Sequence, residues 1–287
     1  MWGGAPPLGR TTLRPTPPSG GFPCNAPFLL QMIIDFHTHL DFYKSKELEP
    51  QLSQFAGTIV AASVDQKSYL ANCAISQFAQ TNTRTCQIIP TFGIHPNRAD
   101  ENAALLDDST TTQRFAQYLS RSPIIGEIGM DFCWSKSSPQ NQEKVFRYFL
   151  EYCNKTRKAC VIHTKDAEQK ICDILTDYPS ARPIIHWYDG PESIYREFIR
   201  RGYPQTFGVE TIRSRHLQNL LRHTPPELLL AETDNPDSEP WLGGTRSDVR
   251  LIERVYEELA ELLNMQQLEL EKIMEDNFNR IFKSSNL

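Results

Sequence analysis

The sequence predicts an α/β fold, a (β/α)8 TIM barrel in a single domain. From Met32 onward, eight short runs rich in β-branched residues alternate with longer amphipathic stretches. This alternation is typical of βαβ units around a parallel sheet. About 250 residues hold the eight units, which is the usual size of such a barrel. A doubly wound open sheet is the structural alternative.

The expected elements follow one another in a regular order. The predicted strands are Ile33–Phe36, Gly57–Val64, Gln87–Ile94, Pro123–Ile128, Lys158–Ile162, Pro183–Ile185, Tyr203–Val209 and Leu228–Ala231. Helical patterns include Gln66–Gln80, Pro139–Arg157, Ala167–Tyr178, Glu192–Arg201, Arg213–Arg222, Asp248–Leu263 and Gln267–Phe282. The chain has no GxGxxG or GxxxxGK[ST] motif, so no nucleotide-cradling loop is indicated.

Residues 1–31 differ from the rest, and we predict a domain boundary between them and residues 32–287. They hold seven of the 20 prolines and five of the 14 glycines, with no Asp or Glu. A segment of this composition cannot order a core, so a disordered extension is expected. A disordered native tail, a transit peptide and an upstream start added to a chain that begins at Met32 are the three interpretations. We favour the third, because a strand begins directly after Met32.

Charge and cysteine content restrict the class of protein. The net charge of −5 argues against binding to nucleic acid or membrane through bulk positive charge, although an enzyme that grips a strand locally is not excluded. No apolar run approaches the ~18 residues of a membrane helix, so no membrane partner is expected. Seven cysteines without a CxxC pair indicate reduced thiols and a cytoplasmic protein.

Polar residues stand where the predicted strands end. Five of the seven histidines follow predicted strands directly. A lone histidine after a strand is more often a hydrogen-bonded core or loop residue, but this repetition is harder to dismiss. The carboxyl ends of barrel strands share one face, so we expect these side chains to converge there. The converging candidates are His37, His39, His163, His186, Glu127 and Asp234.

Imidazole and carboxylate groups together suit divalent ions such as Zn²⁺ or Mn²⁺. Six ligands are too many for one tetrahedral catalytic ion and fit two ions, which need a bridging carboxylate. We predict Glu127 as the bridge, and Asp234 as a ligand that also takes a proton from a bound water. Hydrolysis of a phosphoester or an amide is the expected reaction. Cys160 has the wrong strand parity to share the face of His163 and is interpreted as packing.

Six motifs resemble those of the TatD family, in the family's order and spacing. They are DFHTHLD from residue 35, GIHP (93–96), IGEIGMD (125–131), VIHTKDA (161–167), IIHWYDG (184–190) and ETDNP (232–236). The resemblance runs from Met32 to Phe282 and includes a C-terminal NFNRIF. TatD-like proteins are metal-dependent deoxyribonucleases in the amidohydrolase group of TIM barrels.

The resemblance implies a role for each matching residue. His37 and His39 match the histidines of the first metal, and His163 and His186 match those of the second. Glu127 matches the bridging glutamate. Asp234 matches the aspartate that binds metal and activates water. His95 matches a histidine that approaches the scissile phosphate, and Glu232 matches a partner beside the aspartate. The expected cofactors are two divalent metal ions, Zn, Mg or Mn.

The loops that would meet substrate depart from the family pattern. Thr164-Lys165-Asp166 replaces Ser-Arg-Asp, Trp187-Tyr188-Asp189-Gly190 replaces Cys-Phe-Thr/Ser-Gly, and Asn235-Pro236-Asp237 replaces Ala-Pro-Tyr. Lysine lacks the bidentate fork of arginine, so the grip on phosphate is expected to change. Predicted substrate contacts are Lys165, Trp187 and Arg98. Trp134 and Tyr188 are further candidates for base stacking, and Lys136 and Arg246 for phosphate contact.

The implied function is a DNase, an exonuclease acting on single-stranded or frayed 3′ ends, with nucleic acid as its partner. A place in a bacterial multi-subunit antiphage defence system, with protein partners, is a further expectation from such loops. Two alternatives stay open. One is a small-molecule phosphoesterase or amidohydrolase on the same metal pair. The other is a non-catalytic subunit, against which the complete ligand set argues.

Overall fold

The computed structural model describes residues 33–236, 238 and 247–285, and it has the predicted (β/α)8 barrel fold. All eight predicted strands are present. They are β1 (Ile33–Thr38), β2 (Gly57–Ala61), β3 (Cys86–Pro90), β4 (Ile125–Asp131), β5 (Ala159–Lys165), β6 (Arg182–Ile185), β7 (Gln205–Phe207) and β8 (Leu229–Ala231). The predicted disordered extension and the boundary at Met32 lie outside the described residues and stay predictions.

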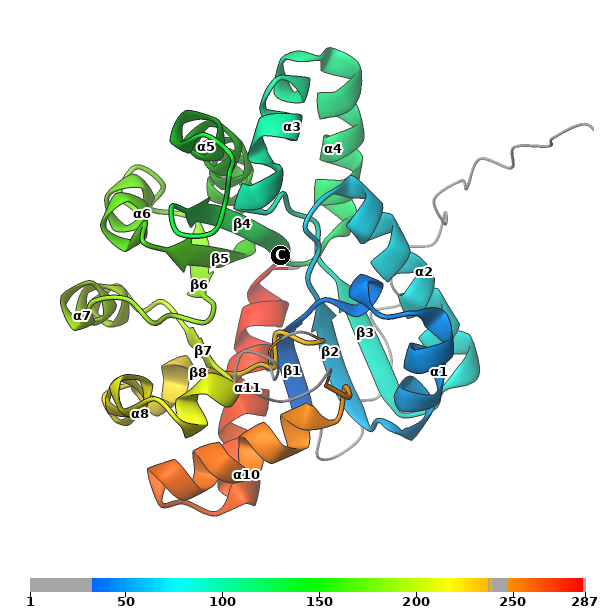
Figure 1. The fold of residues 1–287 in the computed structure, drawn as a ribbon, viewed down its shortest axis with the longest axis vertical. Helices are drawn as coiled ribbons and strands as arrows, with labels where there is room; N and C mark the ends of the chain where they lie inside the picture. The colour runs from blue at the N-terminus through cyan, green and yellow to red at the C-terminus, as the bar shows by residue number, and fades with distance from the viewer. Residues whose placement is uncertain (1–32, 237, 239–246, 286–287) are drawn as a thin grey trace, which may run out of the picture.

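Helices surround the strands in Figure 1. Those of the first half are α1 (Ser45–Gln54), α2 (Gln66–Asn82), α3 (Ala99–Ala103), α4 (Ser109–Arg121) and α5 (Pro139–Thr156). Those of the second half are α6 (Glu168–Leu175), α7 (Glu192–Arg200), α8 (Arg215–Arg222), α10 (Leu251–Leu263) and α11 (Gln267–Ser285). The seven predicted helices are confirmed with boundary shifts of a few residues. No helix of the described segments is long and apolar enough to cross a membrane.

The strands pair in parallel and in chain order. One hydrogen-bonded sheet runs β1-β2-β3 and a second runs β4-β5-β6-β7-β8. A parallel bridge between Phe92 and Ile125 joins the segment after β3 to the start of β4. On the other side, His37 O accepts a hydrogen bond from Asp234 N at 2.9 Å, which ties the end of β1 to the segment after β8. This sequential strand order differs from that of a doubly wound open sheet, so the structural alternative is wrong.

An apolar cluster fills the inside of the barrel below the strand ends. Val161, Ile184 and Leu230 from three different strands belong to it. Phe278 and Ile281 of α11 pack against them and close the amino-terminal end of the strands. His163 lies two residues beyond Val161, and His186 two beyond Ile184, so each points to the same side at the carboxyl-terminal end. The interior is thus apolar at its base and polar at its mouth.

Gly129 allows β4 and β5 to approach closely. Its φ is +150°, and a Cβ atom there would lie 2.0 Å from the carbonyl oxygen of His163. In contrast, Gly202 has a φ of +75°, and a Cβ atom there would have nothing within 4 Å. Glycine is therefore favoured at position 129 both by the positive φ and by the lack of room for a side chain. At position 202 only the positive φ favours it.

We expect Gly129→Ala to lower the free energy of unfolding by about 3 kcal/mol, from backbone strain and overpacking together. Gly202→Ala is the matched control, with strain alone, and is expected to cost about 1–2 kcal/mol. Urea unfolding followed by circular dichroism measures both. Equal losses in the two variants would contradict the close approach of β4 and β5.

Candidate metal centre

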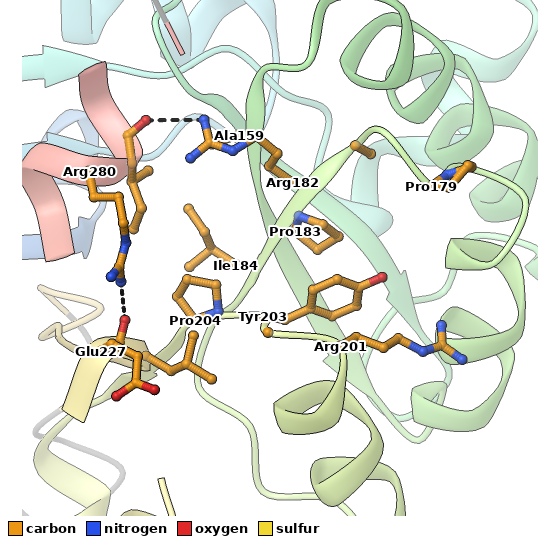
Figure 2. Close-up of a pocket in the computed structure, with 14 residues that line it drawn as sticks. Ala159, Pro179, Arg182, Pro183, Ile184, Arg201, Tyr203, Pro204, Glu227 and Arg280 are labelled. Carbon is orange, nitrogen blue, oxygen red and sulfur yellow. Dashed lines mark hydrogen bonds between the residues drawn. The ribbon is translucent and has the colours of Figure 1, made fainter. Parts of the chain in front are cut away.

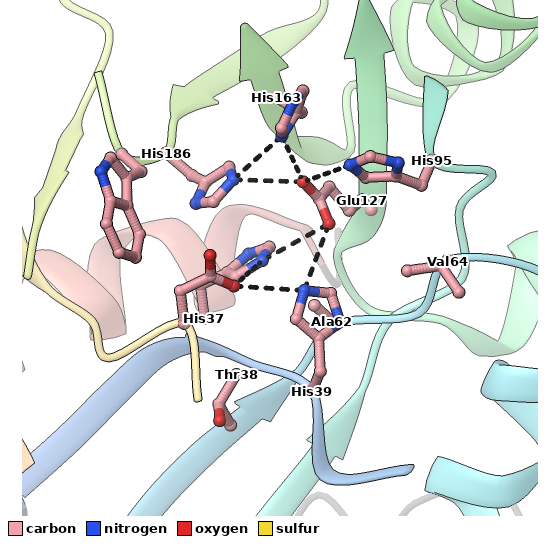
Figure 3. Close-up of polar contacts among 12 residues, drawn as sticks. His37, Thr38, His39, Ala62, Val64, His95, Glu127, His163 and His186 are labelled. Atoms are coloured by element: carbon pink, nitrogen blue, oxygen red, sulfur yellow. Dashed lines mark hydrogen bonds and ion pairs between the residues drawn. The ribbon is translucent and has the colours of Figure 1, made fainter. Parts of the chain in front are cut away.

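The Glu127 carboxylate lies at the centre of the polar mouth, on β4, and is 1% exposed. Its Oε1 atom faces three imidazoles (Figure 3). It lies 2.8 Å from His163 Nδ1, 3.1 Å from His186 Nε2 and 3.5 Å from His95 Nε2. His163 lies in β5, His186 directly follows β6, and His95 lies in the segment after β3, so the parallel strands direct the three imidazoles to one place.

The Oε2 atom of Glu127 faces a second group. It lies 3.5 Å from the Nε2 atoms of both His37 and His39. The Asp234 Oδ1 atom lies 3.5 Å and 3.2 Å from the same two nitrogens. One carboxylate thus has a different set of ligand atoms at each oxygen, which is the arrangement expected of a bridge between two cations.

Two carboxylates outside the cluster orient its histidines. Asp131 Oδ2 lies 3.2 Å from His163 Nε2, leaving His163 Nδ1 to face Glu127. Glu232 Oε2 lies 3.2 Å from His186 Nδ1, leaving His186 Nε2 to face Glu127. Carboxylates that hold the far nitrogen of a metal-ligating histidine fix its ring orientation and raise its basicity.

His95 is oriented differently. Its Nδ1 accepts a hydrogen bond from Asn97 N at 3.1 Å, so the proton of the neutral ring is on Nε2, the atom that faces Glu127. Burial lowers the pKa of His95 to about 4, so the ring is neutral at pH 7. His95 is therefore arranged as a hydrogen-bond donor into the site, whereas His163 and His186 are arranged as ligands.

The charges of the other groups follow from their mutual contacts. Burial raises the pKa of Glu127, but His95 and His37 outweigh burial and hold that pKa well below its usual value. Burial lowers the pKa of His39, but Asp234 outweighs it and raises the pKa to about 9. Asp234 has a lowered pKa, because its contacts with His39 outweigh burial. Both carboxylates are thus ionised and available to a cation.

Unsatisfied polar atoms gather at this place. His37 Nδ1 and Nε2, Glu127 Oε2 and Asp234 Oδ1 are buried and have no hydrogen-bond partner among the described residues. A buried polar atom without a partner costs about 1–3 kcal/mol, and such atoms seldom cluster. The set of nitrogen and carboxylate oxygen donors suits a divalent transition ion. The residues present therefore fit metal ions.

The predicted residues come together as the sequence indicated, with one difference of position. His37, His39, His95, Glu127, His163, His186 and Asp234 share one cluster. Glu232 lies behind His186 and does not face Glu127. Asp131 was missed as an orienting residue. Its place in the strand, four residues after Glu127 and on the same face, was the available signal.

The predicted substrate contacts lie around the cluster. Lys165 is buried, and its Nζ atom lies 2.8 Å from Asp189 Oδ2. Trp187 is half-buried, and its Nε1 donates a hydrogen bond to Glu210 Oε2. Arg98 Nη1 lies 3.5 Å from Glu101 Oε1. Each of these side chains already has a polar partner in the protein.

The remaining candidates divide by exposure. Trp134 is 52% exposed and Lys136 is exposed, so both are accessible to substrate. Tyr188 is 3% exposed, packs against Tyr195 and donates its hydroxyl proton to Pro191 O. Base stacking by Tyr188 is therefore wrong, because its ring belongs to the core. Arg246 lies outside the described residues.

Cys160 is fully buried in the core, which confirms its packing role.

A pocket of about 330 Å³ lies at the opposite end of the barrel. Figure 2 shows that Arg182 and Pro183 of β6, with Pro204 before β7, line it. These residues stand at the amino ends of the strands, and the lining has no histidine. Since barrel enzymes carry out chemistry at the carboxyl ends, the cluster around Glu127 is the candidate active site.

A (β/α)8 barrel with this donor set at its carboxyl-terminal face defines a metal-dependent hydrolase. The profile of the TatD related DNase family matches residues 34–283. The chain belongs to this family, and it is an enzyme that hydrolyses ester bonds with the help of metal. The predicted non-catalytic alternative is set aside by this finding.

Relatives agree with the assignment. An uncharacterized metal-dependent hydrolase of Methanocaldococcus jannaschii, MJ1582, is 28% identical over 193 residues, covering 67% of this chain and 75% of the relative. The 3′-5′ ssDNA/RNA exonuclease TatD of Pectobacterium atrosepticum is 25% identical over 262 residues, covering 86% and 96%. A TatD family hydrolase structure from Entamoeba histolytica has a TM-score of 0.75 at 17% identity, covering 88% and 98%. This last likeness concerns the fold.

Asp131→Asn tests the orienting contact to His163. The variant keeps the side-chain shape but loses the charge that raises the basicity of His163, so we expect metal affinity to fall roughly tenfold or more. Isothermal titration of the metal-free protein with Mn²⁺ or Zn²⁺ measures this. Asp107→Asn, at a surface ion pair with Lys144, is the matched control and should leave affinity unchanged. Equal affinity in wild type and Asp131→Asn would contradict the role.

Proposed function

We propose that this protein is a two-metal phosphodiesterase that degrades DNA from single-stranded or frayed 3′ ends. The observation that carries the proposal is the Glu127 carboxylate, with a separate set of donor atoms at each oxygen. His37, His39 and Asp234 would hold one ion together with Oε2. His163 and His186 would hold the other together with Oε1. Zn, Mg and Mn ions are the candidates.

Bound divalent ions would lower the pKa of a water molecule and polarise the phosphorus–oxygen bond. The protein's own residues supply the rest. Asp234 is ionised, and its side chain is 26% exposed, so it can accept a proton from a water molecule at the mouth. His95 would donate a hydrogen bond through Nε2 to a phosphate oxygen, because its Nδ1 is already an acceptor. Glu232 contacts His186 Nδ1 and so keeps the ring oriented with Nε2 toward Glu127.

Exposed aromatic rings near the mouth support a single-stranded substrate. Phe132 directly follows β4 and is 40% exposed, and Trp134, two residues further on, is 52% exposed. An unpaired base stacked on such a ring contributes about 1–3 kcal/mol. A net charge of −5 is consistent with an enzyme that meets a strand end locally and does not coat duplex. The Pectobacterium relative is named a 3′-5′ ssDNA/RNA exonuclease, which also favours this polarity.

We expect purified protein to shorten 5′-labelled single-stranded DNA from its 3′ end when Mn²⁺ or Mg²⁺ is present. Blunt duplex of the same sequence should be cut more slowly, since its end must fray first. Denaturing gels with and without EDTA measure both rates. No metal-dependent cleavage of any nucleic acid would overturn the nuclease assignment. Cleavage of bis(4-nitrophenyl) phosphate alone would favour the small-molecule phosphoesterase.

Asp234→Asn is expected to retain metal and to lose turnover by about 10²–10⁴-fold, because the amide cannot accept the proton. Elemental analysis and single-turnover kinetics on the same preparation separate the two effects. A near-normal rate would refute the role of Asp234 as a base. An antiphage role, protein partners and a cytoplasmic location stay predictions.

A further inference from the structure

The ammonium group of Lys165, at the mouth of the barrel, contacts a carboxylate, a backbone carbonyl and two tryptophan rings. Lys165 lies two residues beyond His163 on β5, hence on the same face and closer to solvent. Its ammonium lies 2.8 Å from Asp189 Oδ2 and donates a hydrogen bond to Trp187 O at 3.2 Å. The ring centroids of Trp134 and Trp187 lie 5.3 Å and 5.9 Å from Nζ. The side chain of Lys165 is 7% exposed, so these partners, and not solvent, surround its ammonium group.

The loop that carries Asp189 is anchored on both sides. Before it, the Trp187 amide donates hydrogen bonds to Glu232 Oε1 at 2.9 Å and Thr206 Oγ1 at 3.1 Å. After it, Gly190 O lies 2.9 Å from His216 Nε2. Asp189 is therefore held against Lys165 by the fold of the loop, and its own side chain is 36% exposed.

The surroundings of this ion pair are acidic. Burial raises the pKa of Glu168, and the neighbouring charges of Asp189 and Asp166 raise it further. Among the described residues, Lys165 thus lies in a region with several carboxyl groups, including those of Asp189, Asp166 and Glu168. A phosphate that approaches Lys165 meets a positive charge that is already neutralised.

We propose that Asp189 is a specificity-determining residue that competes with a substrate phosphate for Lys165. The inference rests on the proposed phosphodiesterase function. A strand that places a phosphate beside His163 and His186 must displace the Asp189 carboxylate before Lys165 can bind it. The free energy of breaking the pair is subtracted from strand binding, so Asp189 weakens the affinity for a polyanion. The chemical step, which uses the groups around Glu127, is left unchanged.

Steady-state cleavage of a labelled single-stranded 12-mer in Mn²⁺ tests this proposal at several salt concentrations. Asp189→Asn keeps the shape of the side chain and removes the competing charge. We expect KM to fall roughly fivefold with kcat unchanged. The slope of log KM against log salt should steepen by up to about 0.7, the value of one neutralised phosphate on a single strand, because the Lys165–phosphate contact is no longer offset by a released carboxylate. Lys165→Met should raise KM and make the slope shallower.

The double variant separates competition from a structural effect. If Asp189 acts through Lys165, Asp189→Asn leaves KM unchanged in the Lys165→Met background. Asp107→Asn removes an equal charge from the surface pair with Lys144 and should change neither parameter. A higher KM in Asp189→Asn would mean that Asp189 positions Lys165 for substrate, and an unchanged KM would mean that the pair is not displaced. Either result overturns the proposal, whereas a wild type that cleaves no nucleic acid overturns the proposed function itself.

Discussion

The burial of the Glu127 carboxylate is the constraint on which the rest of the site depends. An ionised carboxylate inside a barrel loses its hydration, and burial of an unpaired charge would drive it to the neutral form. Here imidazoles from four strands or strand ends face its two oxygens, and their contacts outweigh the cost of burial. The barrel is the scaffold that makes this possible, because it directs the ends of all its strands to one point.

Irregularities in β1 and β4 orient the side chains of His37 and Glu127 toward the site. Strict alternation of side chains along a strand does not predict these orientations. Ile34 and Phe36 belong to the inner apolar cluster, so alternation alone would turn His37 outward. A register shift between Asp35 and Thr38 brings His37 inside instead. A second shift between Ile125 and Ile128 does the same for Glu127. Such irregularities next to active sites redirect a side chain, and they depend on pairing with a neighbouring strand that periodicity does not reveal.

The fold and the cluster of candidate ligands around Glu127 could be predicted from sequence because each depends on local signals. Strand–helix alternation predicted the barrel, and histidines at strand ends predicted the cluster. The partners of Lys165 and the burial of Tyr188 could not be predicted, since they join different loops across space. Helix α4 was not singled out, because its first turn is rich in threonine, a poor helix former. The Asp108 side chain caps this turn by accepting a hydrogen bond from Thr111 N.

The division between strands and loops also explains how the site tolerates change. Most of the donor atoms at Glu127 come from strands or from residues directly after them, where the sheet fixes the backbone. Lys165, at the last position of β5, meets partners from two loops, and these loops carry the departures from the family motifs. A substitution at Asp189 alters the charge that a substrate meets without moving Glu127. Substrate selection can therefore change while the candidate ligands around Glu127 keep their geometry.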